Sequence, residues 1–155
     1  MNFEPFDTSV IVRRLQKEAR SLHFIGSAAD YAAVQELRGF RTPSAYVVFA
    51  DEENTGKVPT TFCTTQLETA VQFGVVLALR NYQEQQGGQM GDEVRKLIGE
   101  VRAALIGFQP TGRGANVVTW QSGAVLDYDA SVLLFADRYR VPHTLHRGAQ
   151  GANVC

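Results

Sequence analysis

The stretch TAVQFGVVLALRN, residues 69–81, decides the fold because its side chains alternate between bulky and small along the chain. Successive side chains of a β-strand point to opposite faces, so this alternation predicts a strand with one bulky and one small face. We expect extended structure across residues 60–82. Helices should cover the bulky face, and a shallower layer or another subunit should cover the small face. The bulky set is Val71, Phe73, Val75, Leu77 and Leu79; the small set is Ala70, Gln72, Gly74, Val76, Ala78 and Arg80.

Three other segments have the pattern of helices. Residues 8–21 follow side-chain types that favour helix N-termini and place their apolar residues on one stripe. Residues 92–106 keep a similar stripe, begin with two acidic residues that suit the helix dipole, and stop before Gly107. A weaker, alanine-rich helix is expected at residues 27–37.

The remaining segments predict strands, turns and a tail. Residues 45–50 are apolar on both faces, which is typical of a covered strand. Residues 51–59 and 83–91 are polar and contain glycine, so we expect a turn and a loop there. Three further strands are expected at residues 116–121, 124–128 and 131–141, with Ser122 and Gly123 forming a turn between the first two.

This order of segments predicts an α+β fold: a largely antiparallel, mixed sheet with two or three helices packed on one face. The chain has 155 residues, which suits a single domain. We expect that domain to cover residues 1–141. Residues 142–155 are small and polar, and we expect a flexible C-terminal tail, disordered alone or ordered by a partner.

Composition and charge exclude some classes of function. The net charge is −1, whereas a free-standing nucleic-acid binder normally carries a basic excess. The N-terminus lacks the pattern of a signal peptide, and no apolar run is long enough to cross a bilayer. Two cysteines, Cys63 and Cys155, are expected to be free thiols. We therefore expect a soluble protein made in a cytoplasm, without contact with a membrane.

No pattern of catalytic or metal-binding residues is evident. His23 is expected to pack or cap at the end of the first helix, and a site made by His143 and His146 is disfavoured by Pro142 and the nearby glycines. Cys63 lacks a neighbouring cation that would activate it. Gly112-Arg113-Gly114 follows an expected helix and precedes an expected strand, the reverse of the order in a dinucleotide-binding motif. We expect no catalytic residue, no cofactor and no metal.

The order and the amino-acid sequences of several segments resemble those of the tail terminator proteins of long-tailed bacteriophages. The most specific part is ALIGFQP at residues 104–110, followed by WQSGAVLDYD at residues 120–129. The strand PSAYVV at residues 43–48, the acidic residues 51–53 and FADRY at residues 135–139 fall in the same order. The resemblance covers about residues 7–141.

The resemblance implies a structural protein rather than an enzyme. Such proteins form a hexameric ring on the tail tube, stop its polymerisation and present a surface to the head-completion or connector protein, at the head-proximal end of the virion tail. DNA passes through the lumen without specific binding, which an acidic, non-adhesive surface would suit. The candidate residues for the subunit interface, the tube interface or the lumen are Asp51, Glu52, Glu53, Lys57, Gln85, Gln86 and Gln89.

Alternatives stay open at this stage. The acidic residues 51–53 could simply be a solvated turn. The chain could be a head–tail joining or tail-completion protein, which shares the same virion setting. It could also be a small cytosolic enzyme or ligand-binding domain whose site is made only by the fold.

Overall fold

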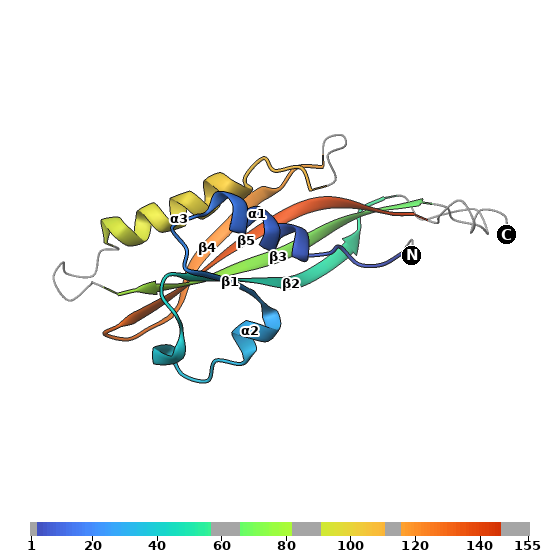
Figure 1. The fold of residues 1–155 in the computed structure, drawn as a ribbon. Coiled ribbons are helices and arrows are strands. Elements are labelled where there is room, and N and C mark those ends of the chain that lie inside the picture. The colour runs from blue at the N-terminus through green and yellow to red at the C-terminus, as the bar shows by residue number, and fades with distance from the viewer. Residues whose placement is uncertain (1–2, 57–65, 82–90, 111–115, 147–155) are drawn as a thin grey trace.

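The computed structural model describes residues 3–56, 66–81, 91–110 and 116–146. These residues form one five-stranded sheet in the order β1-β2-β3-β5-β4, and the pairing of β1 with β2 is parallel while the other three pairings are antiparallel. Figure 1 shows the long strands β2, β3 and β5 side by side in this sheet. The elements are α1 Ser9–Glu18, β1 Phe24–Ser27, α2 Ala28–Ala32, a 3₁₀ turn Leu37–Gly39, β2 Ser44–Asn54, β3 Gln66–Arg80, α3 Asp92–Leu105, β4 Thr119–Tyr128 and β5 Val132–His146.

The predicted bulky face of the long strand is the main core of the protein. All five of its predicted residues are fully buried, and they pack under α1 and α3 with Ile11, Leu15, Val101 and Leu105. Figure 1 places α1 and α3 on the same side of the sheet. The α+β fold with a mixed sheet and two helices on one face is thus confirmed.

The opposite face of the sheet is covered over only part of its length. A smaller cluster joins Tyr46, Val76 and Leu134 to Tyr31 of α2 and to Phe40. Figure 1 shows α2 beneath one half of the sheet, away from α1 and α3. Apart from the buried Ala70, the far halves of β2, β3 and β5 keep exposed or half-buried residues on this face, so the sheet has an open surface there.

Three predicted boundaries are wrong. The chain does not turn at Asp51, because β2 continues to Asn54 by pairing with the start of β3 after an irregularity between Phe49 and Asp51. Ser122 and Gly123 do not turn either; they lie within the continuous strand β4. The predicted tail does not begin at Pro142, since β5 runs to His146 opposite the first residues of β3. Residues 147–155 lie outside the described part.

The N-terminal half also differs in detail from the prediction. The helix expected to reach residue 21 ends at Glu18, and the one expected over residues 27–37 is the short α2 followed by the 3₁₀ turn. A four-residue strand, β1, precedes α2 and was not predicted. It adds a parallel edge to the sheet beside β2.

Candidate functional site

The acidic residues predicted to act together point to different faces of β2. Asp51 and Glu53 are exposed and stand opposite Gln72 and Ala70, on the face that α2 leaves open. Glu52 stands opposite Val71 and accepts a hydrogen bond of 2.8 Å from the Thr69 hydroxyl. Glu52 therefore holds the end of β2 to β3, while Asp51 and Glu53 remain available to a partner. The other candidates, Lys57, Gln85, Gln86 and Gln89, lie outside the described residues.

The histidines singled out from the sequence do not form a metal site. His143 and His146 are three residues apart on β5, so their side chains point to opposite faces of the sheet. The His143 ring packs edge-on against Phe6 at 5.5 Å. Within the described ranges, no group of three or more His, Cys, Asp or Glu side chains could hold a metal ion. Cys63 and residues 112–114 fall outside those ranges.

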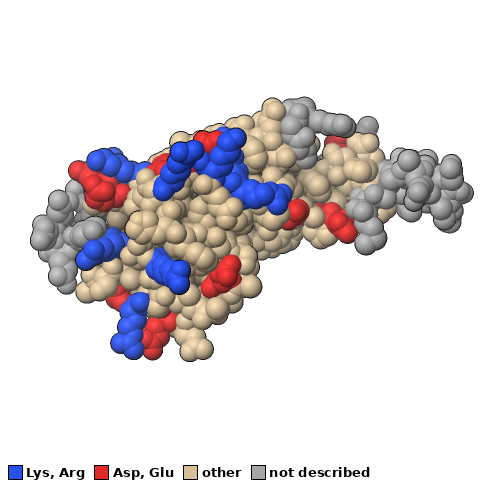
Figure 2. Space-filling view, in the orientation of Figure 1, with Lys and Arg blue, Asp and Glu red and all other residues tan. Residues whose placement is uncertain are grey.

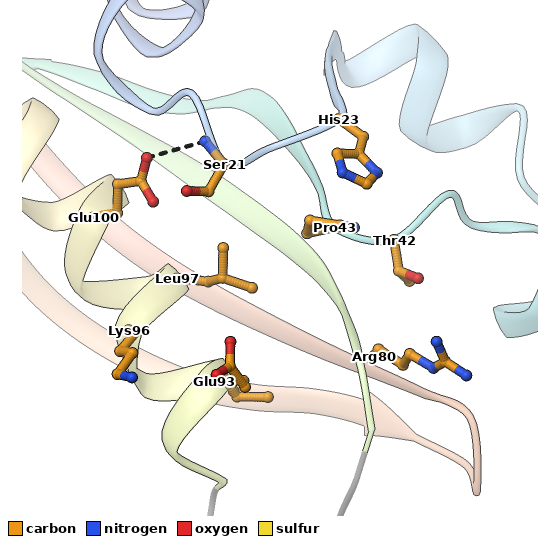
Figure 3. Close-up of a pocket in the computed structure, with 10 residues that line it drawn as sticks. Ser21, His23, Thr42, Pro43, Arg80, Glu93, Lys96, Leu97 and Glu100 are labelled. Carbon is orange, nitrogen blue, oxygen red and sulfur yellow. Dashed lines mark hydrogen bonds between the residues drawn. The ribbon is translucent and has the colours of Figure 1, made fainter.

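A cleft of about 650 Å³ lies between the first half of α3 and the ends of β2 and β3. Figure 3 shows Glu93, Lys96, Leu97 and Glu100 on α3, with His23, Pro43, Thr42 and Arg80 across from them. The Glu100 carboxylate accepts a hydrogen bond of 3.1 Å from the Ser21 backbone N–H. That contact ties α3 to the segment after α1, so this carboxylate has a structural role in the cleft.

The most elaborate polar cluster surrounds Asp137 of β5, whose side chain is fully buried. Arg102 of α3 donates two hydrogen bonds to it, at 2.9 Å from Nε to Oδ2 and 2.8 Å from Nη2 to Oδ1. The indole N–H of Trp120 donates to Oδ1 at 2.8 Å, and the Tyr139 hydroxyl donates to Oδ2 at 3.2 Å. Both carboxylate oxygens are thus satisfied, as a buried charge requires.

This cluster joins three elements, α3, β4 and β5. The Arg102 guanidinium also lies 4.8 Å from the centre of the Trp120 ring, so Trp120 of β4 is held both by a hydrogen bond and by a cation–π contact. Burial, with the neighbouring Asp137 charge, raises the pKa of the Tyr139 hydroxyl above its ordinary value. The hydrogen bonds from Arg102 to Asp137 raise the pKa of the guanidinium above its ordinary value.

Strand β4 is the most exposed element of the sheet, and sequence reasoning missed its importance. All ten of its residues are exposed. Its exposed large apolar side chains are Trp120, Val125, Leu126 and Tyr128. Within the described part of the chain, β4 pairs on one side alone, with β5. The signal was present in WQSGAVLDYD, whose large apolar residues stand among small ones and whose charged residues, Asp127 and Asp129, fall at its end.

Positively charged side chains are concentrated on the opposite side of the molecule from β4. Figure 2 shows Lys and Arg side chains concentrated over α1. Arg13, Lys17 and Arg20 are exposed there, whereas Arg14 donates a hydrogen bond of 2.9 Å to the Ala104 carbonyl and so links α1 to α3. The surface of α1 is therefore basic although the whole chain carries a net charge of −1.

The described helices are all too short or too polar to cross a membrane.

Comparison with known proteins identifies the family. No curated protein matches the chain significantly. A family model described as "Phage tail terminator protein" matches residues 1–151, which includes every element of the fold and both segments that carried the resemblance. The match places the protein among structural components of the phage tail and hence in the virion. The chain belongs to the phage tail terminator protein family.

Proposed function

We propose that the protein forms a closed hexameric ring that caps the head-proximal end of the tail tube. There it stops addition of further tube protein and offers a surface to the head-completion or connector protein. It acts by shape and contact, with no catalytic step and no cofactor. The family match over residues 1–151 is the observation that carries this proposal.

The architecture supports a ring of identical subunits. A closed ring with rotational symmetry uses two different, complementary patches on each subunit. Here the sheet ends in two different strands, β1 and β4, and one of them exposes a row of large apolar residues. Such a row favours burial against a partner, because exposed apolar patches on soluble proteins usually mark contact sites.

The open face of the sheet is our candidate for the surface that meets the tube or lines the lumen. Asp51 and Glu53 of β2 lie on it, and by register Glu68 of β3 and Arg138 and Arg140 of β5 share it. This mixture of charges would not hold the phosphates of passing DNA strongly, because phosphate affinity grows with the number of unopposed cations. Lys57, Gln85, Gln86 and Gln89 stay candidates for contact with a neighbouring subunit or the tube, or for the lumen.

Addition of purified protein to extracts tests the proposal. Cells infected with a phage that lacks this gene would supply heads and tail tubes that are still being assembled, and the protein would be added at that stage, before infectious particles are counted. We expect the titre to rise, and gold-labelled protein to sit at the head-proximal end of each tail. Label along the tube, at the tail tip or on the head alone would contradict the proposed location.

A further inference from the structure

The free edge of β4 lacks most of the features that normally keep a sheet edge from pairing. Natural edge strands are usually short or bulged, or carry lysine, proline or inward-pointing charges. β4 has ten residues and contains neither lysine nor proline, and Asp127 is its one charged residue. Two irregularities interrupt its register with β5, yet the strand remains continuous. An edge of this kind is suited to pairing with another strand.

This edge is also held in place before any partner arrives. Trp120 is fixed by its bond to the buried Asp137, and Gly123 lies so close to that carboxylate that a Cβ there would come within 2.6 Å of Oδ1. A strand already fixed in its bound conformation loses less conformational entropy on association. The first half of β4 is therefore anchored to the domain, and the second half continues the same strand beside β5 up to Tyr128.

The other edge of the same sheet, β1, offers a complementary surface. Among the described residues β1 pairs only with β2. A hollow of about 540 Å³ lies against it, and it is lined by both apolar and basic groups. The lining residues are Gln16, Ala19, Arg20, Leu22, His23, Phe24 and Ile25. A hollow beside one edge and a row of exposed apolar side chains on the other are the two unlike patches that a head-to-tail contact needs.

We infer that the β4 edge of one copy pairs with the β1 edge of the next copy, so that the sheets join around the ring. This inference rests on the proposed ring. Strand directions fix the orientation of the junction: β1 and β4 run in opposite directions within one sheet. For the sheets of neighbouring copies to be continuous, the ring axis must run roughly along the strands. Rotation about such an axis preserves these directions, so β4 of one copy meets β1 of its neighbour antiparallel.

The charges at the two edges favour a second copy of the chain as the partner, and they indicate which part of β4 makes the contact. Antiparallel pairing brings the C-terminal end of β4 beside the start of β1. The first carries Asp127, followed by Asp129, whose carboxylate accepts hydrogen bonds from the Val132 and Ser131 backbone N–H groups that lower its pKa. The start of β1 is flanked by the exposed Arg20 and by Arg41, whose guanidinium lies 5.8 Å from the Phe24 ring. Acidic and basic ends thus meet across the junction.

A photo-crosslink in assembled tails tests this pairing. A benzoylphenylalanine would replace Tyr128, which is 62% exposed, and purified phage particles would be irradiated and digested with trypsin. We expect a crosslink between Tyr128→benzoylphenylalanine and the peptide of residues 21–38. The two sites lie at opposite edges of one subunit, with β2, β3 and β5 between them, so this product must join two copies.

Any other crosslink result would contradict the β4–β1 pairing. The number of copies per tail separates that result from failure of the ring itself. A crosslink from Tyr128 to another part of a second copy, to the tube protein or to nothing leaves the ring in place and removes the β4–β1 junction. A single copy of the protein per tail, by quantitative mass spectrometry, removes the ring and the junction together.

A pair of surface variants supplies an independent readout. L126K/Y128K adds positive charge to the end of β4 that faces Arg20 and Arg41, and we expect it to fold but to lose complementation of the gene-deleted phage. The matched control is Ile106→Lys: Ile106 is 51% exposed, close to the 52% of Leu126, but it precedes Gly107, whose N–H donates to the Val118 carbonyl just before the other end of β4. Full complementation by L126K/Y128K, or equal loss in the control, would contradict the inference.

Discussion

Arg102 of α3 and Asp137 of β5 form a two-bond ion pair in which the carboxylate is fully buried and the guanidinium side chain is 33% exposed. The two residues therefore stand in unequal environments. If Arg102 is lost, a buried charge keeps only its bonds from Trp120 and Tyr139. If Asp137 is lost, the guanidinium can turn toward water. The pair anchors β4, through Trp120, to the rest of the domain.

This asymmetry predicts unequal costs for the two truncations. Arg102→Met should lower the free energy of unfolding by about 3 kcal/mol, the low end for a broken buried pair because water partly reaches Arg102. Asp137→Asn should cost about 1–2 kcal/mol, since a neutral amide leaves donors imperfectly matched but no buried charge. Urea unfolding measures both values. A larger loss for Asp137→Asn than for Arg102→Met would contradict the account of the pair.

Gly123 provides a steric test of the same cluster. A Cβ at this position would lie 2.6 Å from Asp137 Oδ1, 2.8 Å from Arg102 Nη2 and 2.9 Å from Phe135 Cζ. Gly123→Ala should therefore cost about 1–3 kcal/mol, the usual range for overpacking. Gly99→Ala is the matched control, because nothing lies within 4 Å of its Cβ and the helix should gain up to about 1 kcal/mol. Equal effects in urea melts would show that the cluster tolerates expansion.

Tyr139 predicts how stability changes in alkaline solution. Burial raises the pKa of its hydroxyl above the ordinary value of 10.0, so above that pH the unfolded chain releases this proton while the folded chain keeps it. The folded state then binds more protons, and stability falls as pH rises by up to about 1.4 kcal/mol per pH unit for this group.

Removal of the hydroxyl isolates the effect. Tyr139→Phe should flatten the loss of stability between about pH 10 and pH 12. Urea melts at pH 9 and pH 11 give the slopes. An unchanged slope in Tyr139→Phe would mean that its hydroxyl ionises in the folded protein as it does in water.

Helix α3 offers a test of the predicted core. Leu105 is fully buried under the sheet, and Leu105→Ala should cost about 2–5 kcal/mol. Leu97 is only half-buried and lines the cleft in Figure 3, so Leu97→Ala should cost clearly less. Denaturant melts of the two variants provide the comparison. A larger loss of stability for Leu97→Ala than for Leu105→Ala would mean that a different face of α3 packs on the sheet.

Sequence periodicity predicted the elements that need only an apolar layer to pack against, whichever residues that layer contains. The alternation around Val71–Leu79 was sufficient for β3, because any covering helix buries the bulky face. The stripe in residues 92–106 was sufficient for α3, which spans Asp92–Leu105. Local pattern determines these elements, so their prediction did not require knowledge of partners.

Boundaries that depend on pairing could not be predicted. Gly123 was interpreted as a turn residue, but it is small because Asp137 and Arg102 occupy the space beside it. Pro142 was interpreted as the end of the domain, although β5 continues past it opposite Ala70. The Arg102–Asp137 pair spans 35 residues, and neither residue stands out in the local sequence.

The candidate site was predicted only in part for the same reason. Residues 51–53 were grouped as one acidic cluster, whereas strand geometry separates Glu52 from Asp51 and Glu53. The exposed edge of β4 was overlooked because apolar residues in a strand usually indicate burial. A strand is exposed when the order of strands places it at an edge of the sheet, and that order cannot be predicted from the sequence of β4 alone.

Charge reversal on the open sheet face tests its proposed role in assembly. D51K/E53K should fold normally, since exposed charges contribute little to stability. It should nevertheless reduce complementation, because the added lysines repeat around the ring and bind DNA phosphates. The control Glu52→Lys breaks the bond from Thr69 and should lower stability instead. Normal infectivity and normal tails with D51K/E53K would remove this face from the functional surface.

The lengths of tail tubes in a phage that lacks this gene test the central claim most directly. Electron microscopy of lysates measures the length distribution and the fraction of tubes joined to heads. If the protein terminates the tube, the tubes should lack heads and extend well beyond the wild-type length, and supply of the protein in trans should restore both features. Headless tails of normal length would contradict termination and would instead indicate a protein that joins completed tails to heads.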